Sequence, residues 1–499
     1  MFARKSLLTL ISNLIYYFVY GITLLFAVNK FLPSNFGYLK IATSLMGFFL
    51  FFSDLSFTIL HSKMMAEDTE PQNDYFTTYF IIKIVLTIFS SFIIFGVIIF
   101  QINAKIISNN SLQIGIIAIM YFSSVIQSVN LLYRSSFAAK LQIARKEIAF
   151  ISSKLIGSIY LLLVIFFSNN FLLYVSGTLF SESLFLILNI ILGKDFRLTK
   201  IRRDMIYKYF SLGAILIIPA IILTFSTNLG PLLYKVYHKD DDILGVYDVI
   251  TNFFIMISLL EGTIRVLLIP NYSSLITQKK FKELKNSIKA FEKYITLLNS
   301  LIIIGGIISG PYLLKTFLGE FYYDNGIVLY FGGLIALFSF GVFVPYSSLI
   351  FASGKLKIYI FTHVFLLIFL LISWFLLIPP LGVIAIDLVK WIYWIPNAIV
   401  IRYYCVKYFN IGKMEKNNIL NYLILLIFMI SSFFLSIYIH DELIPIMISI
   451  VSFLSLYIIV LFVFKILNKQ DLEFFREIIN PKKMINYIKT EIKNHSEDQ

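Results

Sequence analysis

Long apolar stretches, separated by short polar ones, follow one another along the whole chain. A transmembrane helix needs roughly 20 mainly apolar residues to cross the hydrocarbon core, and about 14 stretches meet that length. The pattern predicts an all-α polytopic membrane protein. The predicted spans are residues 7–28, 39–60, 78–100, 112–133, 147–168, 171–192, 209–230, 243–269, 294–318, 326–351, 357–378, 381–404, 418–439 and 444–467.

The composition agrees with a membrane protein. Hydrophobic residues make up 59% of the chain and charged residues 14%, whereas soluble proteins have about 50% and about a quarter. Cys405 is the only cysteine, so a disulfide within the chain and a cysteine-based metal site are excluded. We expect no cofactor and no metal ion.

The basic residues set the expected topology. Arg4 and Lys5 precede the first apolar stretch, which is long enough to span and has no A-x-A-like cleavage site, so we interpret it as a helix and not as a signal peptide. If the spans alternate from an internal N-terminus, most lysines and arginines fall in internal segments. The net charge of +14 therefore indicates membrane topology, with both termini cytoplasmic, and no nucleic-acid partner.

Two short sequences recur at similar distances. FAAKLQI (137–143) and FASGKLKI (351–358) lie 215 residues apart when their lysines are aligned (355 − 140). GYLKIAT (37–43) and GVYDVIT (245–251) lie 208 residues apart (245 − 37). Both echoes hold matching places in a six-helix unit, which predicts two lobes related by a parallel repeat, with the substrate site between them. Shared turn chemistry at helix ends is the alternative.

This repeat predicts the organisation of the chain. The expected parts are an N-lobe (1–192), a basic cytoplasmic linker (193–208), a C-lobe (209–404), two further helices (405–467) and a cytoplasmic tail (468–499).

Residues 279–293 carry a second basic pattern. Apolar residues recur there at helical spacing with lysines between them, which is typical of an amphipathic helix lying on an anionic leaflet. Anionic membrane lipids are therefore expected partners.

Several motifs resemble a known family. FLPSNFGYLKIATSLMGFFLFFSDLS (31–56), LGEFY (318–322), ASGK (352–355) and PPLGVIA (379–385) are similar to the bacterial polysaccharide repeat-unit flippases (Wzx-type, O-antigen or capsule). That family belongs to the multidrug/oligosaccharidyl-lipid/polysaccharide (MOP) exporter superfamily. The chain departs from the family's usual glycines at Ser56 and at Ala385, both small replacements that preserve close helix packing.

The resemblance implies transport and no enzymatic activity. Family members move undecaprenyl-diphosphate-linked oligosaccharides across the bacterial inner membrane by alternating access, for O-antigen, lipopolysaccharide or capsule synthesis. The implied partners are this lipid-linked substrate, a coupling ion (proton or sodium), a polysaccharide polymerase and a chain-length regulator.

Charged residues within predicted spans are functional candidates, because a charge in a bilayer is costly. A lipid diphosphate needs cations, which favours a phosphate role for Arg265, Lys390 and Lys83. The carboxylates are candidates for gating or for binding the coupling ion: Asp54, Glu182, Glu261 and Asp387.

Most candidates also have a structural interpretation. Asp54 would hold the helix predicted over 39–60 near its cytoplasmic end. Glu261 with Arg265, and Asp387 with Lys390, would be self-neutralising pairs on one helix face. Lys83 would extend its ammonium to the inner surface. His363 fits either a proton relay or a packing histidine.

Prolines distinguish the second lobe. Pro219, Pro345 and Pro396 fall inside predicted spans, whereas the first six spans contain none. Because proline kinks helices, we predict hinges at these positions, and at 209–230 above all.

Other functions remain open at this point. A drug antiporter or a flippase of the peptidoglycan lipid precursor would share the fold. A membrane polysaccharide polymerase or prenyl-diphosphate transferase is disfavoured, because no long external loop is predicted and the only aspartate run is the compact 240–242.

Overall fold

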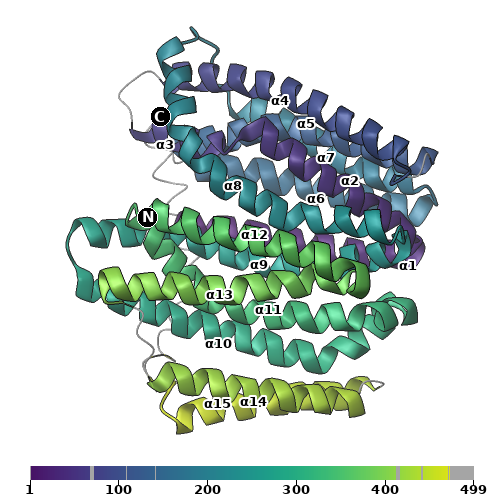
Figure 1. The fold of residues 1–499 in the computed structure, drawn as a ribbon, viewed down its shortest axis with the longest axis vertical. Helices are drawn as coiled ribbons and strands as arrows, with labels where there is room; N and C mark the ends of the chain where they lie inside the picture. The colour runs from purple at the N-terminus through teal and green to yellow at the C-terminus, as the bar shows by residue number, and fades with distance from the viewer. Residues whose placement is uncertain are drawn as a thin grey trace.

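The computed structural model describes residues 2–67, 72–107, 110–140, 142–411, 416–439, 442–469 and 471. These residues form fifteen α-helices and one π-helical turn, and no strand occurs among them (Figure 1). The elements are α1 (Phe2–Lys30), α2 (Pro33–Asp54), α3 (Phe57–Glu67), α4 (Gln72–Asn103), α5 (Ser111–Ala139), α6 (Ile143–Phe167), α7 (Phe171–Leu192), α8 (Arg203–Tyr237), α9 (Asp241–Thr277), α10 (Phe281–Leu313), η1 (Leu314–Leu318), α11 (Glu320–Ala352), α12 (Leu356–Leu381), α13 (Ile384–Phe409), α14 (Lys416–Tyr438) and α15 (Leu443–Val463).

The prediction of an all-helical, multi-pass membrane protein is confirmed. Eleven segments of the described residues are long and apolar enough to cross a membrane. Each predicted span except 39–60 falls mainly on one long helix, although α9, α11 and α13 are not among the eleven segments. The number of fourteen spans therefore stays a prediction.

One predicted span is two helices. The sequence predicts a continuous helix over 39–60, but α2 ends at Asp54 and α3 begins at Phe57. Leu55 and Ser56 between them have φ values of 46° and 64°, a left-handed conformation that is costly for residues other than glycine. Ser56 is one of the two positions where the family that the chain resembles usually has glycine. The left-handed backbone at the break explains that preference, because glycine adopts this conformation without strain.

The packing of the first six long helices recurs in the next six. In the first set, α1 packs on α6, α2 on α4 and α5, α5 on α4 and α7, and α6 on α7. In the second set, α8 packs on α12, α9 on α10 and α11, α11 on α10 and α13, and α12 on α13. Each contact of one set thus has its counterpart in the other, which supports the predicted two-lobe repeat.

The two sets share an apolar core at one end of the molecule, where α2 and α9 begin. Phe36 of α2, Leu244 of α9 and Trp374 of α12 belong to this one cluster. At the opposite end the buried apolar residues divide into separate clusters, of which two are the largest. One contains Tyr79 of α4, and the other contains Tyr272 of α9.

Helix α8, the first helix of the second set, packs on helices of both sets. Near its start, Tyr209 is buried in the apolar cluster of α3 and α4, and a Cβ at Gly213 would lie 2.2 Å from Phe57 of α3. Near its end, Gly230 lies against Ile386 of α13. The predicted boundary at residue 209 therefore falls within a helix that connects the two sets.

The predicted linker is held against α4. The backbone amide of Thr199 donates a hydrogen bond to Thr77 Oγ1 (2.8 Å), and its hydroxyl donates one to Asp74 Oδ1 (2.7 Å). Phe196 stacks on Phe76 with ring centroids 5.0 Å apart. Residues 193–202 are thus attached to the first set of helices.

The amphipathic pattern at 279–293 has another explanation. This segment is the start of α10, where Leu284 and Ile288 are fully buried in one cluster with Tyr272 and Tyr346. Most of the apolar face therefore packs inside the protein, whereas Phe281 at its start is 48% exposed.

Helices α14 and α15 lie along α10, at the lower edge of the molecule in Figure 1. Lys293 and Tyr294 of α10 contact the Asp471 carboxylate at 2.6 and 2.9 Å. Burial alone would raise the pKa of the Asp471 carboxyl, but the hydrogen bonds from Lys293, Tyr294 and the Asn468 backbone together hold it below its usual range. Most of the predicted tail, from residue 472 onward, lies outside the described residues.

Candidate functional site

Helices α2 and α9 touch through their glycines. A Cβ at Gly37 would lie 2.0 Å from the Asp241 carbonyl oxygen, and a Cβ at Gly245 would lie 1.9 Å from the Pro33 carbonyl oxygen. The two glycines are 208 residues apart (245 − 37), and so are the two carbonyl residues (241 − 33). The contact is therefore reciprocal, as expected at an axis that relates two copies of one unit. Only residues without a side chain let the two backbones come this close.

Asp241, at the start of α9, is held next to this contact. Its carboxylate accepts a hydrogen bond from Lys235 of α8. Burial nevertheless raises the pKa of the Asp241 carboxyl above its usual value. The Lys235–Asp241 pair thus lies partly desolvated beside the crossing of α2 and α9, at the end of the molecule where these two helices begin.

One turn further into the bundle lies an interface cluster made of Lys40, Tyr247, Asp248, Asp387 and Lys390. Lys40 of α2 forms an ion pair with Asp248 of α9 at 3.1 Å. Lys390 of α13 donates to Tyr247 Oη (2.8 Å) and to Asp387 Oδ1 (3.2 Å). The Tyr247 hydroxyl donates in turn to Asp387 Oδ1 (3.3 Å), and Lys40 lies 5.2 Å from the centroid of the Tyr247 ring.

The interface cluster contains two cations and two carboxylates, so its charges compensate one another. Of its members, the sequence singled out Asp387 and Lys390, and it missed Lys40, Tyr247 and Asp248. The signal was present, because Lys40 and Asp248 are equivalent positions of the repeated sequences at 37–43 and 245–251. Opposite charges at equivalent positions can pair across the axis, whereas identical charges would repel.

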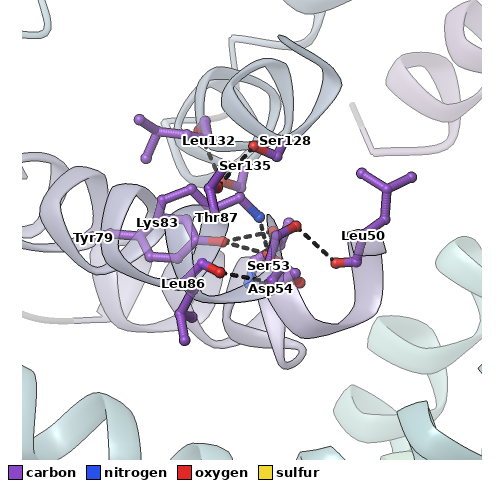
Figure 2. A network of polar contacts seen from close by, with 12 residues as sticks. Leu50, Ser53, Asp54, Tyr79, Lys83, Leu86, Thr87, Ser128, Leu132 and Ser135 are labelled. Carbon is purple, nitrogen blue, oxygen red and sulfur yellow. Dashed lines mark hydrogen bonds and ion pairs between the residues drawn. The ribbon is translucent and has the colours of Figure 1, made fainter. Parts of the chain in front are cut away.

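A second cluster, the break cluster, surrounds Asp54 at the end of α2 (Figure 2). Asp54 Oδ1 accepts hydrogen bonds from Lys83 Nζ (2.5 Å) and Tyr79 Oη (2.7 Å), both of α4. It also accepts one from the Thr58 hydroxyl (2.5 Å), and Asp54 Oδ2 lies 3.4 Å from the Thr58 backbone amide. His61 completes the cluster, stacked on Tyr79 with ring centroids 4.6 Å apart.

The break between α2 and α3 explains this arrangement. The first turn of α3 has free backbone amides, and the Asp54 carboxylate lies beside one of them. Lys83 is only 1% exposed, so it points into the bundle toward Asp54 and does not reach the inner surface. His61 bonds Tyr209 Oη of α8 (2.6 Å) and Ser136 Oγ of α5 (2.9 Å), which ties α3 to both helices.

A third cluster, the first-half cluster, contains Glu182. Glu182 of α7 pairs with Lys154 of α6 at 2.6 Å and accepts a hydrogen bond from Asn130 of α5 at 2.9 Å. Asn189 donates to the side chain of Asn130 at 3.1 Å. The sequence had marked Glu182 but missed Lys154, which lies inside the predicted span 147–168.

A fourth group was missed completely. Glu292 of α10 is 2% exposed and accepts bonds from Arg402 of α13 (2.6 Å), Tyr346 of α11 (2.5 Å) and Tyr422 of α14 (2.6 Å). Arg402 stood at the edge of a predicted span and Glu292 outside one, so neither counted as a buried charge. This group connects α14 to the second set of helices.

The remaining candidates are distributed differently. The side chains of Glu261 and Arg265 lie outside the described part of the structure. His363 is 4% exposed, and its Nε2 lies 3.3 Å from Asn397 Nδ2, which fits a packing histidine. Candidate residues therefore occur in separate clusters and not in one site.

The predicted hinges lie inside helices: Pro219 in α8, Pro345 in α11 and Pro396 in α13. Pro219 lies between the start of α8, which packs on α3 and α4, and its later part, which packs on α2 as well as on the second set of helices. The hinge role of the three prolines stays a prediction.

Comparisons with known proteins can now be set beside this architecture. Residues 31–325 match a family model described as "Polysaccharide biosynthesis protein". A comparison with curated proteins by sequence gave no match.

Solved structures are similar in fold. A lipid II flippase, MurJ, in an inward closed conformation has a TM-score of 0.66 and 14% identity, covering 91% of this chain and 98% of that one. A multidrug resistance MATE transporter in an inward-facing conformation has a TM-score of 0.66 and 10% identity, covering 79% and 94%. A MOP-superfamily transporter from Pyrococcus furiosus has a TM-score of 0.54 and 11% identity, covering 83% and 96%.

These identities are low, so the structural likeness concerns the fold alone, which this chain shares with MurJ and the MATE transporter. The family model covers 295 residues (325 − 31 + 1) of the 499 in the chain, which is more than half. The chain belongs to the polysaccharide biosynthesis protein family.

Proposed function

We propose that the chain is a flippase of the Wzx type. It moves undecaprenyl-diphosphate-linked oligosaccharide units from the inner to the outer leaflet of the bacterial inner membrane, for O-antigen or capsule synthesis. Membership of the polysaccharide biosynthesis protein family supports a saccharide substrate. The transporter fold supports movement across the membrane as the task.

One observation carries the mechanism: the two helix sets share a core at one end only. They are joined by the glycine contact of Gly37 with Gly245, by the interface cluster and by one apolar cluster. At the other end their apolar clusters are separate. An alternating-access transporter closed on one side has this form, and the positive-inside pattern assigns the closed end to the outer face.

Helix α8 provides the joint between the two lobes. Its start packs on α3 and α4 of the first lobe, and its later part packs on both lobes. In the proposed change of access, α8 bends at Pro219, and Pro345 and Pro396 allow bending within the second lobe. The attached segment 193–202 is too well held to act as the flexible connection.

The buried carboxylates are candidates for coupling to an ion gradient. Glu182 and Asp387 each have a lysine partner, as does Asp54, and a proton can replace that partner when the helices separate. Lys390 and Arg265 stay phosphate candidates. Lys83 fits a phosphate role less well, because it is buried and already paired with Asp54.

The experiment that tests the function uses the gene in its host. Its deletion should leave lipid-linked repeat units on the inner leaflet, where an added impermeant glycan-oxidising reagent cannot reach them. Reintroduced wild-type protein should restore surface polymer. Full-length surface polymer in the deletion strain would refute a flippase, and a block in cell-wall synthesis alone would assign the peptidoglycan precursor as the substrate.

A further inference from the structure

A basic segment leads into α8 with few carboxylates to balance it. We call residues 193–210, which comprise the linker and the first two turns of α8, the basic strap. Its two aspartates are already paired, Asp195 with Arg145 of α6 at 2.5 Å and Asp204 with Arg202 at 2.8 Å. Among the described residues, no carboxylate lies within ion-pairing distance of the four exposed cations that recur at every third position: Lys194, Arg197, Lys200 and Arg203.

The basic strap is held in a fixed position against α4. The backbone amide of Arg197 donates a hydrogen bond to Asn73 Oδ1, and that of Arg202 donates one to Thr78 Oγ1, both at 3.4 Å. The two hydrogen bonds of Thr199 lie between these contacts. Because α4 holds the backbone at three amides, the exposed cations keep fixed places along the surface of the protein.

The contacts with α4 place the basic strap at a surface of the membrane. Asn73 and Thr78 lie in the first two turns of the apolar segment Gln72–Asn103, which has 32 residues. Because roughly 20 residues cross the hydrocarbon core, the ends of this helix reach the headgroup region. The positive-inside rule assigns the end that carries the strap to the inner leaflet, opposite the closed end at Gly37 and Gly245.

Large apolar side chains lie between these cations and follow them. The exposed ones are Leu198, Ile201, Tyr207 and Phe210. Segments that combine basic residues with aromatic and aliphatic ones lie at the boundary between headgroups and acyl chains of anionic membranes. A soluble acidic partner would neutralise the cations but would not require the apolar side chains, whereas a lipid matches both.

We infer that the basic strap binds the headgroups of anionic phospholipids in the inner leaflet. Its cations contact the lipid phosphates, and its exposed apolar side chains lie among the upper parts of the acyl chains. An anionic leaflet attracts juxtamembrane lysines and arginines, and the attraction adds up over a polybasic segment. Because the strap leads directly into α8, lipid bound there fixes the start of the helix that packs on both lobes. This inference does not depend on which substrate the protein carries.

The start of α10 offers a matched control. It has four exposed lysines as well: Lys279, Lys280, Lys282 and Lys285. The span predicted there begins only at residue 294, so Lys285 lies about 13 Å before it along the helix axis, at a rise of 1.5 Å per residue. Lys280 is also paired with Glu283 at 3.7 Å. We therefore expect these lysines to lie beyond the headgroups.

The experiment titrates the purified full-length protein in detergent with phosphatidylglycerol and counts the bound lipids by native mass spectrometry. Wild type should bind phosphatidylglycerol more tightly than phosphatidylcholine. In the strap variant K194Q/R197Q/K200Q/R203Q we expect the affinity for phosphatidylglycerol to fall at least about tenfold, because four cations near the headgroups are lost. The control variant K279Q/K280Q/K282Q/K285Q should bind like wild type. All eight substituted residues are exposed, so both variants should fold.

A second variant tests the apolar part of the surface. L198Q/I201Q keeps every cation, and its affinity for phosphatidylglycerol should still fall several-fold, because the lipid also contacts these two side chains. Glycerol 3-phosphate, which resembles the headgroup without acyl chains, should compete poorly. An unchanged affinity of L198Q/I201Q would contradict the contact with acyl chains.

A measurement on wild type alone needs no variant. Added salt should weaken the binding of phosphatidylglycerol, because dissolved ions screen exposed charges. Binding that salt leaves unchanged would contradict recognition by the cations of the strap.

Several further results would overturn the inference. The strap variant could bind phosphatidylglycerol as tightly as wild type, or the control variant could lose as much affinity, which would indicate only an effect of net charge. Full displacement by glycerol 3-phosphate would assign a soluble phosphate as the ligand. Equal binding of phosphatidylglycerol and phosphatidylcholine would leave a soluble acidic partner for the cations. The proposed function would stand in each case, because it is tested on lipid-linked repeat units.

Discussion

Two buried lysine–aspartate pairs hold α2, one near each of its ends. One pair joins α2 to a helix of the other lobe, and the other joins α2 to a helix of its own lobe. Lys40 pairs with Asp248 of α9 in the other lobe. Asp54 pairs with Lys83 of α4 in the same lobe. The chemistry is the same, but one pair connects two units that separate in the proposed mechanism, and the other connects two helices of the same unit.

The surroundings of the pairs reflect this difference. The Asp54 carboxylate accepts bonds from Lys83, Tyr79 and Thr58, so the break of the helix depends on it. Among the described residues, Asp248 is paired across the interface with Lys40, next to glycines that permit contact without interlocking side chains. Disrupting the break cluster should therefore unfold the protein, whereas disrupting the interface should change its conformation.

The glycine contact gives the largest expected effect on transport. G37V places a side chain where the Asp241 carbonyl oxygen already lies, 2.0 Å from the new Cβ. We expect the closed outer end to lose more than about 4 kcal/mol, which abolishes surface polysaccharide in a complemented deletion strain. G96V on α4 is the control, since nothing lies within 4 Å of a Cβ there. Normal polymer with G37V would show that the lobes do not close at this contact.

Asp54 gives the largest expected effect on stability. D54A leaves the buried ammonium of Lys83 without its partner, and breaking such a pair costs about 3–5 kcal/mol. We expect a markedly lower thermal unfolding temperature and less folded protein in detergent. The double variant D54L/K83M should recover much of this loss, because an apolar pair needs no neutralisation. Equal unfolding temperatures for D54A and wild type would argue for a purely functional Asp54.

The Lys40–Asp248 pair should affect transport without unfolding the protein. K40D brings two carboxylates together at the interface, and we expect transport to fall about tenfold, equivalent to about 1.4 kcal/mol. The exchange K40D/D248K restores opposite charges and should restore transport, while the unfolding temperature changes little. If the exchange were no better than K40D alone, the charges would matter for another reason, such as contact with substrate.

Pro219 should give the smallest effect of the four. P219A restores a backbone hydrogen bond within α8 and stiffens the helix, so export should fall several-fold while folding is unaffected. P345A is the comparison, because α11 packs only on helices of the second lobe. Export should fall less with P345A than with P219A. Unchanged glycan output with P219A would mean that α8 does not bend there.

Part of the site could be predicted from local sequence. Lys390 and Asp387 are three residues apart on one helix, so their contact follows from helix geometry. Asp54 and Lys83 were both recognisable as charges inside spans, but they lie on different helices. Their pairing depends on the left-handed turn at Leu55 and Ser56, which hydropathy does not report.

The sequence by itself determined that the chain is helical and membrane-embedded. A long apolar segment in lipid must satisfy its own backbone hydrogen bonds, and an α-helix does so within the segment. It also contained the repeat, since the equivalent positions 37 and 245, and 40 and 248, are visible in two short segments. Only the tertiary structure decided that these positions face one another and that Glu292 and Arg402 are buried partners. The physical reason is that hydropathy is a property of each segment, whereas the neutralisation of a charge depends on which helix packs against it.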